Sequence, residues 1–491
     1  MLKTGSEHLE SLRDGRTIFI GNERVADVTT HPAFRNGAQS IANIYDMKRA
    51  PENRELMTFE ENGERYSGYF LRARSKADLE FRYGVHRAIS DSTYGMFGRS
   101  PDHVSSFVTG MSLKPEEFGK YADNLLAYYE HMRKTDCYAA YAVVPPPAAR
   151  NPDFYQANNL PMPALRVVRE DDDGVVISGT KMLATGAAYA NDIWIGNLIP
   201  LAPDQADQAI TCAIPCNAPG VELWSRKPFG RDTRSDFENP LGYRYDESDS
   251  MLLCKEVKVP WEKVFVHGDP LLARQIYVQT AGHTYGNHQS NVRFLSKMQL
   301  IVGVASKIAK ASGADKIPAV RETLGKLAAW EATLYGMVMG QLQAAEEWPT
   351  QGYWCFNRRL VYAALNWCTE NYSSIIDELR ELCGGSVFQM PADISVMSDP
   401  ELRGVFEKYW ATPQLAAVDR MKLYKLAWDL TGSEFAGRHQ QYEKFYAGAS
   451  FVVRNYNYMH TDWQALEGVA ERLLSSYGVP EEYLQEEASA A

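Results

Sequence analysis

The sequence predicts an α+β protein in which a mainly helical segment, a β-rich segment and a second helical segment follow one another. Apolar residues recur at helical spacing between residues 53 and 135, and again from residue 275 onward. Between them, from residue 137 to about 269, short apolar runs alternate with turn signals. A chain of 491 residues exceeds what one hydrophobic core supports, so two to four domains are expected.

The first segment, residues 1–136, is predicted to be a mainly helical domain with one short strand at residues 17–20. Its most informative stretch is the turn signal at residues 98–103, which projects a permanent cation, Arg99, and a titratable imidazole, His103. If Pro101 opens a helix, the helix N-terminus, Arg99 and His103 converge and favour an anion. The alternative is a solvated turn with an incidental histidine.

The middle segment, residues 137–270, is predicted to be a β sandwich or barrel. A hairpin turns at Asp173-Gly174, an Asp-Gly pair typical of tight turns. The other strands are predicted at residues 138–144, 193–195, 209–214, 221–224, 251–254 and 257–260. The small residues Ala184, Thr185, Gly186 and Ala187 form either a turn that a planar ligand can approach closely or a plain tight hairpin.

The last segment, residues 271–491, is predicted to be a helical bundle with apolar stripes at residues 320–337 and 362–382. Gly384, Gly385 and Ser386 break the second stripe, a further helix follows at residues 401–430 apart from Pro413, and residues 432–446 are polar. An acidic tail ends the chain. His283 and His288 could be ligands, but without a nearby carboxylate or cysteine cluster structural hydrogen bonds are the simpler interpretation.

Charge and composition exclude several classes of protein. A net charge of −11 argues against nucleic acid or an anionic membrane as a partner. No apolar run reaches the length of a membrane span, and the first ten residues do not form a secretory signal. Seven scattered cysteines favour reduced thiols in the cytoplasm, and Cys212 and Cys216 lack the second pair that a metal site needs. The standard glycine-rich motifs for nucleotides are absent.

Long ordered stretches at residues 5–16, 98–102, 176–185, 259–264 and 425–439 resemble the 4-hydroxyphenylacetate 3-monooxygenase family. The resemblance covers nearly the whole chain and implies an acyl-CoA dehydrogenase-like fold. It implies the oxygenase component of a two-component system, which receives reduced FAD (FADH2) from a separate NAD(P)H:flavin reductase. Such an enzyme reacts the flavin with O2 to a C4a-hydroperoxide and transfers one oxygen atom to a phenol ring. A homotetramer is also implied.

The resemblance also implies catalytic roles. The family holds the phenol hydroxyl with an arginine, a tyrosine four residues later, and a histidine on the strand that opens the β domain. Arg99 matches the arginine, whereas His103 stands at the tyrosine position and Tyr141 at the histidine position. We therefore expect His103 to act as the base, Arg99 to hold the resulting anion and Tyr141 to donate a hydrogen bond.

This exchange means that the family's hydroxyphenylacetate specificity does not carry over. A halophenol, a nitrophenol, a larger phenol or a nitrogen heterocycle remain alternative substrates. For the flavin, the resemblance points to Thr185 with its neighbours in residues 184–187, and to residues 384–386 of another subunit.

Two other interpretations fit the residues of this sequence less well. A 4-hydroxybutyryl-CoA dehydratase of the same superfamily would need a Cys-x-x-x-Cys pair at the positions of Arg99 and His103, and a histidine and a cysteine around His288. This chain has no cysteine between residues 255 and 354. An inactive scaffold that keeps the fold is disfavoured by the presence of Arg99 with a titratable partner, and would show itself by failing to bind reduced flavin.

Overall fold

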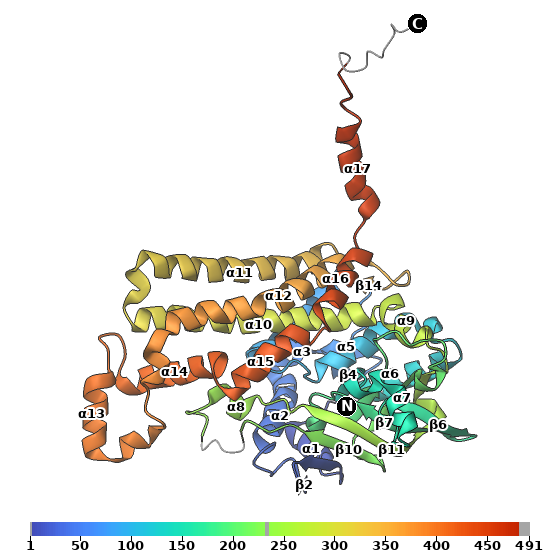
Figure 1. Cartoon of the computed structure of the whole chain (residues 1–491), viewed down its shortest axis with the longest axis horizontal. Helices are drawn as coiled ribbons and strands as arrows, with labels where there is room; N and C mark the ends of the chain where they lie inside the picture. The colour runs from blue at the N-terminus through green and yellow to red at the C-terminus, as the bar shows by residue number, and fades with distance from the viewer. Residues whose placement is uncertain (1, 231–234, 481–491) are drawn as a thin grey trace.

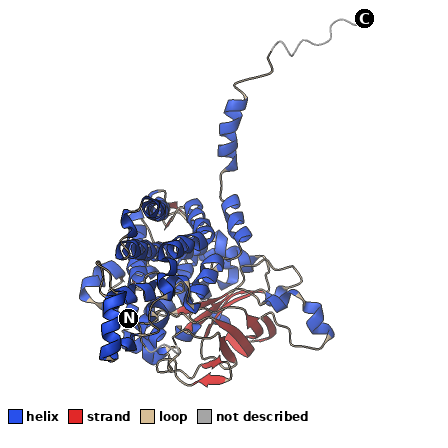
Figure 2. Ribbon diagram, turned by 60° about the vertical axis from the view of Figure 1, so that its left-hand side comes forward, coloured by secondary structure: helices blue, strands red, loops and turns tan. Residues whose placement is uncertain are grey.

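The computed structural model describes residues 2–230 and 235–480. Its strands are β1 (Thr17–Ile20), β2 (Glu23–Val25), β3 (Thr58–Glu61), β4 (Glu64–Ser67), β5 (Ala139–Ala142), β6 (Arg166–Asp171), β7 (Gly174–Lys181), β8 (Asp192–Ile195), β9 (Ile210–Pro215), β10 (Val221–Ser225), β11 (Ser250–Pro260), β12 (Val264–His267), β13 (Glu346–Glu347) and β14 (Trp354–Cys355). Figure 2 shows that most strands gather on one side of the molecule, with helices beside them.

The helices before the C-terminal bundle are α1 (Gly5–Ser11), α2 (Arg35–Arg49), α3 (Arg54–Met57), α4 (Lys76–Ser92), α5 (Asp102–Met111), α6 (Ala122–Thr135), α7 (Pro152–Ala157), α8 (Pro240–Arg244) and α9 (Leu272–Gln279). The C-terminal segment contains α10 (Gly282–Ala311), α11 (Pro318–Gln343), α12 (Arg358–Cys383), α13 (Pro400–Trp410), α14 (Ala417–Thr431), α15 (Glu434–Phe445), α16 (Ser450–Met459) and α17 (Trp463–Leu474). The predicted helical, β and helical order is confirmed.

Two sheets form the β part. The larger has the order β2-β1-β10-β11-β7-β6, and the smaller has the order β12-β9-β8-β5. Strand β1 pairs in parallel with β10, so that Thr17 faces Glu222 and Ile20 faces Ser225. The three-domain division at residues 137 and 271 stays a prediction, and this pairing shows that the N-terminal segment contributes strands to the larger sheet.

Close helix packing positions the centre of the molecule. Every residue of α5 is buried, and α5 lies against the N-terminal half of α10, which is itself buried throughout. Glycines make this approach possible, because a Cβ on Gly286 would lie 1.9 Å from the Phe107 ring. Helices α10, α11 and α12 run side by side above this region (Figure 1).

Two local predictions needed correction. Residues 53–135 contain a β3–β4 hairpin that the helical pattern concealed. The two strands expected at residues 251–254 and 257–260 are one strand, β11, with a register shift where Glu256 takes a φ of 50°. The polar residues 432–446 contain α15, in agreement with the predicted helical segment, and the charged side chain of Glu443 on this helix is buried.

Gly384–Phe388 continue the chain after α12 as a short 3-10 turn, so the predicted break is confirmed. The end of the predicted acidic tail, residues 481–491, lies outside the described residues. Among residues 2–230 and 235–480, no helix is both long and apolar enough to cross a membrane.

Candidate active site

The predicted turn before α5 is a buried loop that holds Arg99 from several sides. The helix begins at Asp102 directly after Pro101, as the sequence predicts. The Arg99 backbone nitrogen donates to Glu247 Oε1 at 2.6 Å, and its carbonyl accepts the Tyr138 hydroxyl at 2.5 Å. One guanidinium nitrogen donates to the carbonyl of Tyr446 at 2.8 Å. The cation is therefore fixed in direction, and the interpretation as a solvated turn is wrong.

The second guanidinium nitrogen of Arg99 lies 2.6 Å from Nε2 of His103. On the other side of the ring, Nδ1 of His103 lies 3.1 Å from Gln289 Oε1. The Gln289 amide nitrogen faces Asp102 Oδ1 at 3.4 Å, which orients the amide with its oxygen toward the imidazole. Because that oxygen accepts, Nδ1 carries the proton and Nε2 presents a lone pair to Arg99.

The environment keeps this imidazole neutral. Burial, followed by the Arg99 cation, lowers the pKa of His103 well below its ordinary value. A histidine with a lowered pKa stays unprotonated at neutral pH and remains able to accept a proton. The structure thus brings Arg99 and His103 together with the base form facing the cation.

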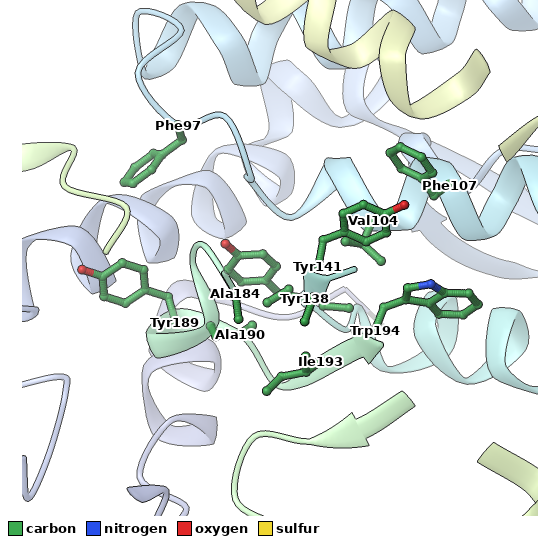
Figure 3. Close-up of a cluster of buried hydrophobic side chains, with 14 of the residues drawn as sticks. Phe97, Val104, Phe107, Tyr138, Tyr141, Ala184, Tyr189, Ala190, Ile193 and Trp194 are labelled. Carbon is green, nitrogen blue, oxygen red and sulfur yellow. The ribbon is translucent and has the colours of Figure 1, made fainter. Parts of the chain in front are cut away.

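Tyr141 reaches the same place from β5. Its ring centroid lies 6.0 Å from that of His103 and 5.1 Å from that of Phe107, and Figure 3 shows it beside Phe107. The Tyr141 hydroxyl is buried, neighbours that of Tyr277 and makes no hydrogen bond of good geometry. Burial raises the pKa of Tyr141 well above its ordinary value, so this phenol stays protonated and is a donor.

The turn of residues 184–187 lies beside the Arg99 loop. Thr185 pairs with Tyr141 in an isolated bridge, and its hydroxyl donates to Asp249 Oδ1 at 2.8 Å. Gly186 has a φ of 78°, and a Cβ there would lie 2.3 Å from the Tyr138 hydroxyl. The segment is therefore a tight turn, and the approach of a planar ligand to it stays a prediction.

Cations and carboxylates surround this turn. Arg438 on α15 bonds Asp249 and lies 2.8 Å from Glu247 Oε2, the residue that also holds the Arg99 backbone. The buried hydroxyls of Tyr442 and Tyr446, on the same part of the chain, lack hydrogen-bond partners among the described residues. The unpaired hydroxyls of Tyr446 and of Tyr442, whose ring lies close to Arg438, are therefore polar groups that a bound molecule can hydrogen-bond.

The structure separates residues 384–386 from this site. They lie at the C-terminal end of α12, where Gly384 and Gly385 are exposed and the turn packs against α14 and α12. Their predicted role requires another subunit and stays a prediction.

Two predicted structural histidines are confirmed as such. Nδ1 of His283 lies 2.6 Å from the Tyr362 hydroxyl. His288 stacks on Phe356 with centroids 3.6 Å apart and lies 2.7 Å from Gln341 Oε1. Sequence reasoning missed Gln289, next to His288, because a single glutamine within a helical pattern carries no signal of which side chain it will orient.

Comparison with known proteins identifies the class. Residues 4–266 match the family description "4-hydroxyphenylacetate 3-hydroxylase N terminal", and residues 273–475 match "4-hydroxyphenylacetate 3-hydroxylase C terminal". A relative from Rhodococcus sp, "4-nitrophenol 2-monooxygenase, oxygenase component", is 31% identical over 97% of this chain and 92% of its own length.

Solved structures agree. The oxygenase component of 4-hydroxyphenylacetate 3-monooxygenase, complexed with FAD and 4-hydroxyphenylacetate, aligns with a TM-score of 0.91 and 28% identity over 96% of this chain and 98% of that one. An archaeal 4-hydroxybutyryl-CoA dehydratase from N. maritimus shares the fold at a TM-score of 0.85 and 19% identity, over 100% of this chain and 98% of that one.

The fold and the site thus define a flavin-dependent monooxygenase. The chain belongs to the 4-hydroxyphenylacetate 3-hydroxylase family. The predicted family, fold class and enzyme class are confirmed.

Proposed function

We propose that this chain is the oxygenase component of a two-component monooxygenase, which uses O2 and reduced FAD from a separate NAD(P)H:flavin reductase to hydroxylate an aromatic ring. The observation that carries the proposal is the Arg99–His103 pair, in which a fixed cation meets the lone pair of a neutral imidazole. Such a pair takes a proton from a phenol and stabilises the phenolate, the form of the ring that accepts oxygen.

The residues beside this pair fit a flavin. The turn at Gly186 brings backbone close to the Arg99 loop, and the unpaired Tyr442 and Tyr446 hydroxyls offer hydrogen bonds to a polar ring edge. We assign residues 184–187, with Thr185 foremost, to FAD binding. When bound in its reduced form, FAD supplies the O2-activating chemistry while the protein supplies position and exclusion of water.

The proton transfer follows from the geometry around His103. A substrate hydroxyl that replaces the Arg99 N–H at Nε2 gives its proton to that nitrogen, while Arg99 stays close enough to hold the phenolate. Gln289 keeps Nδ1 protonated and so keeps Nε2 available. Tyr141, whose phenol stays protonated, donates a hydrogen bond from across the site.

The exchange of histidine and tyrosine bears on the substrate. We propose an aromatic substrate other than 4-hydroxyphenylacetate, with halophenols, nitrophenols, larger phenols and nitrogen heterocycles as the classes to test. A relative named for 4-nitrophenol supports widening the search in this way. The cytoplasm is the proposed location, supported by seven cysteines that are all free thiols and all buried.

The decisive experiment titrates the pure chain anaerobically with FADH2 and with FAD, then mixes the reduced complex with O2 and a panel of phenols in a stopped-flow instrument. We expect tighter binding of FADH2 than of FAD, hydroxylated product with at least one phenol, and NADH oxidation only after a flavin reductase is added. Rapid NADH oxidation by the chain and FAD alone would refute the two-component assignment.

We also propose a homotetramer. Figure 1 shows α17 projecting away from the body of the molecule, and none of its residues is buried. Yet this helix and the residues that follow it carry seven exposed apolar side chains. Those on the helix are Trp463, Leu466, Val469, Leu473 and Leu474, and those after it are Tyr477 and Val479. An exposed apolar stripe on a projecting helix supports docking onto another copy of the chain.

Deleting the residues from 462 onward should therefore weaken the assembly. We expect sedimentation at micromolar concentration to show a tetramer for the full chain and smaller species for the shortened one. Replacing the exposed Glu467 and Glu471 of α17 with glutamine is the matched control, and should leave the tetramer intact. A full-length chain that sediments as a monomer would contradict the proposal.

A further inference from the structure

Three side chains from separate elements meet where the parallel pair β5–β8 begins. His131 lies near the C-terminal end of α6, Cys137 just before β5, and Asp192 is the first residue of β8. In the pairing of these strands, Asp192 faces Ala139, two residues beyond Cys137. One donor atom from each of the three side chains lies within 4.8 Å of the other two.

We propose that His131, Cys137 and Asp192 bind a divalent transition-metal ion, for which Zn²⁺ is the best match. An imidazole nitrogen, a thiolate and a carboxylate oxygen are the three ligand types that Zn²⁺ takes in proteins. Ligands bound to one Zn²⁺ lie about 3.5 Å apart, so small side-chain movements bring three donors within 4.8 Å of one another into that range. Soft thiolate disfavours Mg²⁺ and Ca²⁺, which take oxygen ligands.

The surroundings suit an ion that enters from solvent. Cys137 is buried and Asp192 is half-buried, whereas His131 is exposed, so the imidazole side provides both an entry path and a position for a water ligand. The Tyr128 hydroxyl donates to Asp192 Oδ2 at 3.1 Å and orients that carboxylate, as partners of metal ligands do. Tyr128 also stacks on His131 with centroids 6.1 Å apart.

The net charge of the ion together with its three ligands is close to zero once the ion is bound. The Cys137 side chain is a free thiol in the structure. Binding forms a sulfur–metal bond, breaks the S–H bond and releases one proton to solvent, with no change of oxidation state. The thiolate and carboxylate then offset the two positive charges of the ion. Lys263 and Lys3 are the nearby cations that oppose binding.

This site is independent of the proposed function. Within residues 2–230 and 235–480, no hydrogen bond joins its ligands to Arg99, His103 or Tyr141, although Cys137 precedes Tyr138, whose hydroxyl donates to the Arg99 carbonyl. An ion here would tie α6 to the two strands at the start of their pairing, and would stabilise the strand that carries Tyr141.

The test uses the full chain, purified with a chelator and then freed of it. Titration with Co²⁺ should produce one equivalent of a sulfur-to-cobalt charge-transfer band, and added Zn²⁺ should displace it. Cys137→Ala should abolish the band, and His131→Gln and Asp192→Asn should each weaken Zn²⁺ binding by at least ~10-fold. Cys212→Ala removes another buried thiol of the same sheet and is the matched control, which should bind as the full chain does.

Circular dichroism confirms that each variant is folded, and Cys137→Ser serves if the alanine variant is not. A titration of the folded chain without the charge-transfer band, or equal Zn²⁺ affinity in the full chain and in Cys137→Ala, would overturn the inference. Neither outcome depends on flavin binding or on hydroxylation.

Discussion

Replacing His103 with alanine is expected to slow aromatic hydroxylation by ~10²–10⁴-fold, the usual contribution of a positioned general base. The variant should still bind reduced FAD and consume O2, but the oxygen should end as H2O2 rather than in product. Single-turnover stopped-flow experiments that quantify product and H2O2 together measure both effects. We expect this loss because Nε2 of His103 carries the lone pair that faces Arg99.

Tyr141→Phe is the comparison that tests the assignment of roles. It removes a hydroxyl without removing the ring that packs on Phe107, so it should cost about one hydrogen bond, ~0.5–1.5 kcal/mol. Because the pKa of His103 is lowered by burial and by Arg99, hydroxylation should not decline between pH 8 and pH 6.5 through protonation of this residue. Near-normal coupling in His103→Ala with abolished coupling in Tyr141→Phe would show that the roles are reversed.

Glu443→Gln is expected to lower the free energy of unfolding by ~3–5 kcal/mol, because it leaves two buried cations without their counter-ion. Glu443 on α15 is fully buried and pairs with Arg293 and Lys297 of α10. Burial opposes ionisation of this carboxyl, but Arg293 and then Lys297 outweigh it and lower its pKa from 4.5 to about 2. Urea denaturation monitored by circular dichroism measures the loss.

The pH dependence of this contribution has a definite sign. A carboxyl with a lowered folded-state pKa stabilises the protein above its unfolded value, here about 4.5, and the stabilisation is lost as the pH falls toward 2. Glu434→Gln on the same helix is the control, because its pair with Lys227 is exposed and should be worth at most ~1 kcal/mol. Equal stability of the Glu443 and Glu434 variants would disprove the counter-ion role.

Local sequence signals predicted most elements of this fold but not all. The Asp-Gly turn between β6 and β7 and the apolar stripes of α11 and α12 were readable because periodicity and turn chemistry act over a few residues. The burial of Glu443 and His439 on α15 was not readable, because buried ionic groups leave no apolar stripe in the sequence. The bulge at Glu256 was also unreadable, since a single unpaired residue leaves the strand pattern looking like a break.

Some residues of the site could likewise be predicted from the sequence, and others could not. Arg99 and His103 are four residues apart at the N-terminus of α5. Their proximity followed from this spacing once Pro101 was placed at the helix start. Tyr141 was found through family resemblance, since only the tertiary fold brings β5 to α5. Gln289 and Glu247 escaped notice because they act by orienting groups more than a hundred residues away in the sequence.

The parallel pairing of β1 with β10 has a consequence for how the chain is made. About two hundred residues separate the two strands, and at ~5–20 residues per second a ribosome needs on the order of ten to forty seconds to cover that distance. During that interval β1 has only its short hairpin with β2, which is marginal in water. The apolar side chains of Ile18 and Ile20 therefore lack their β10 neighbours on the nascent chain, and the larger sheet is complete only after β11, when more than half of the protein has been synthesised.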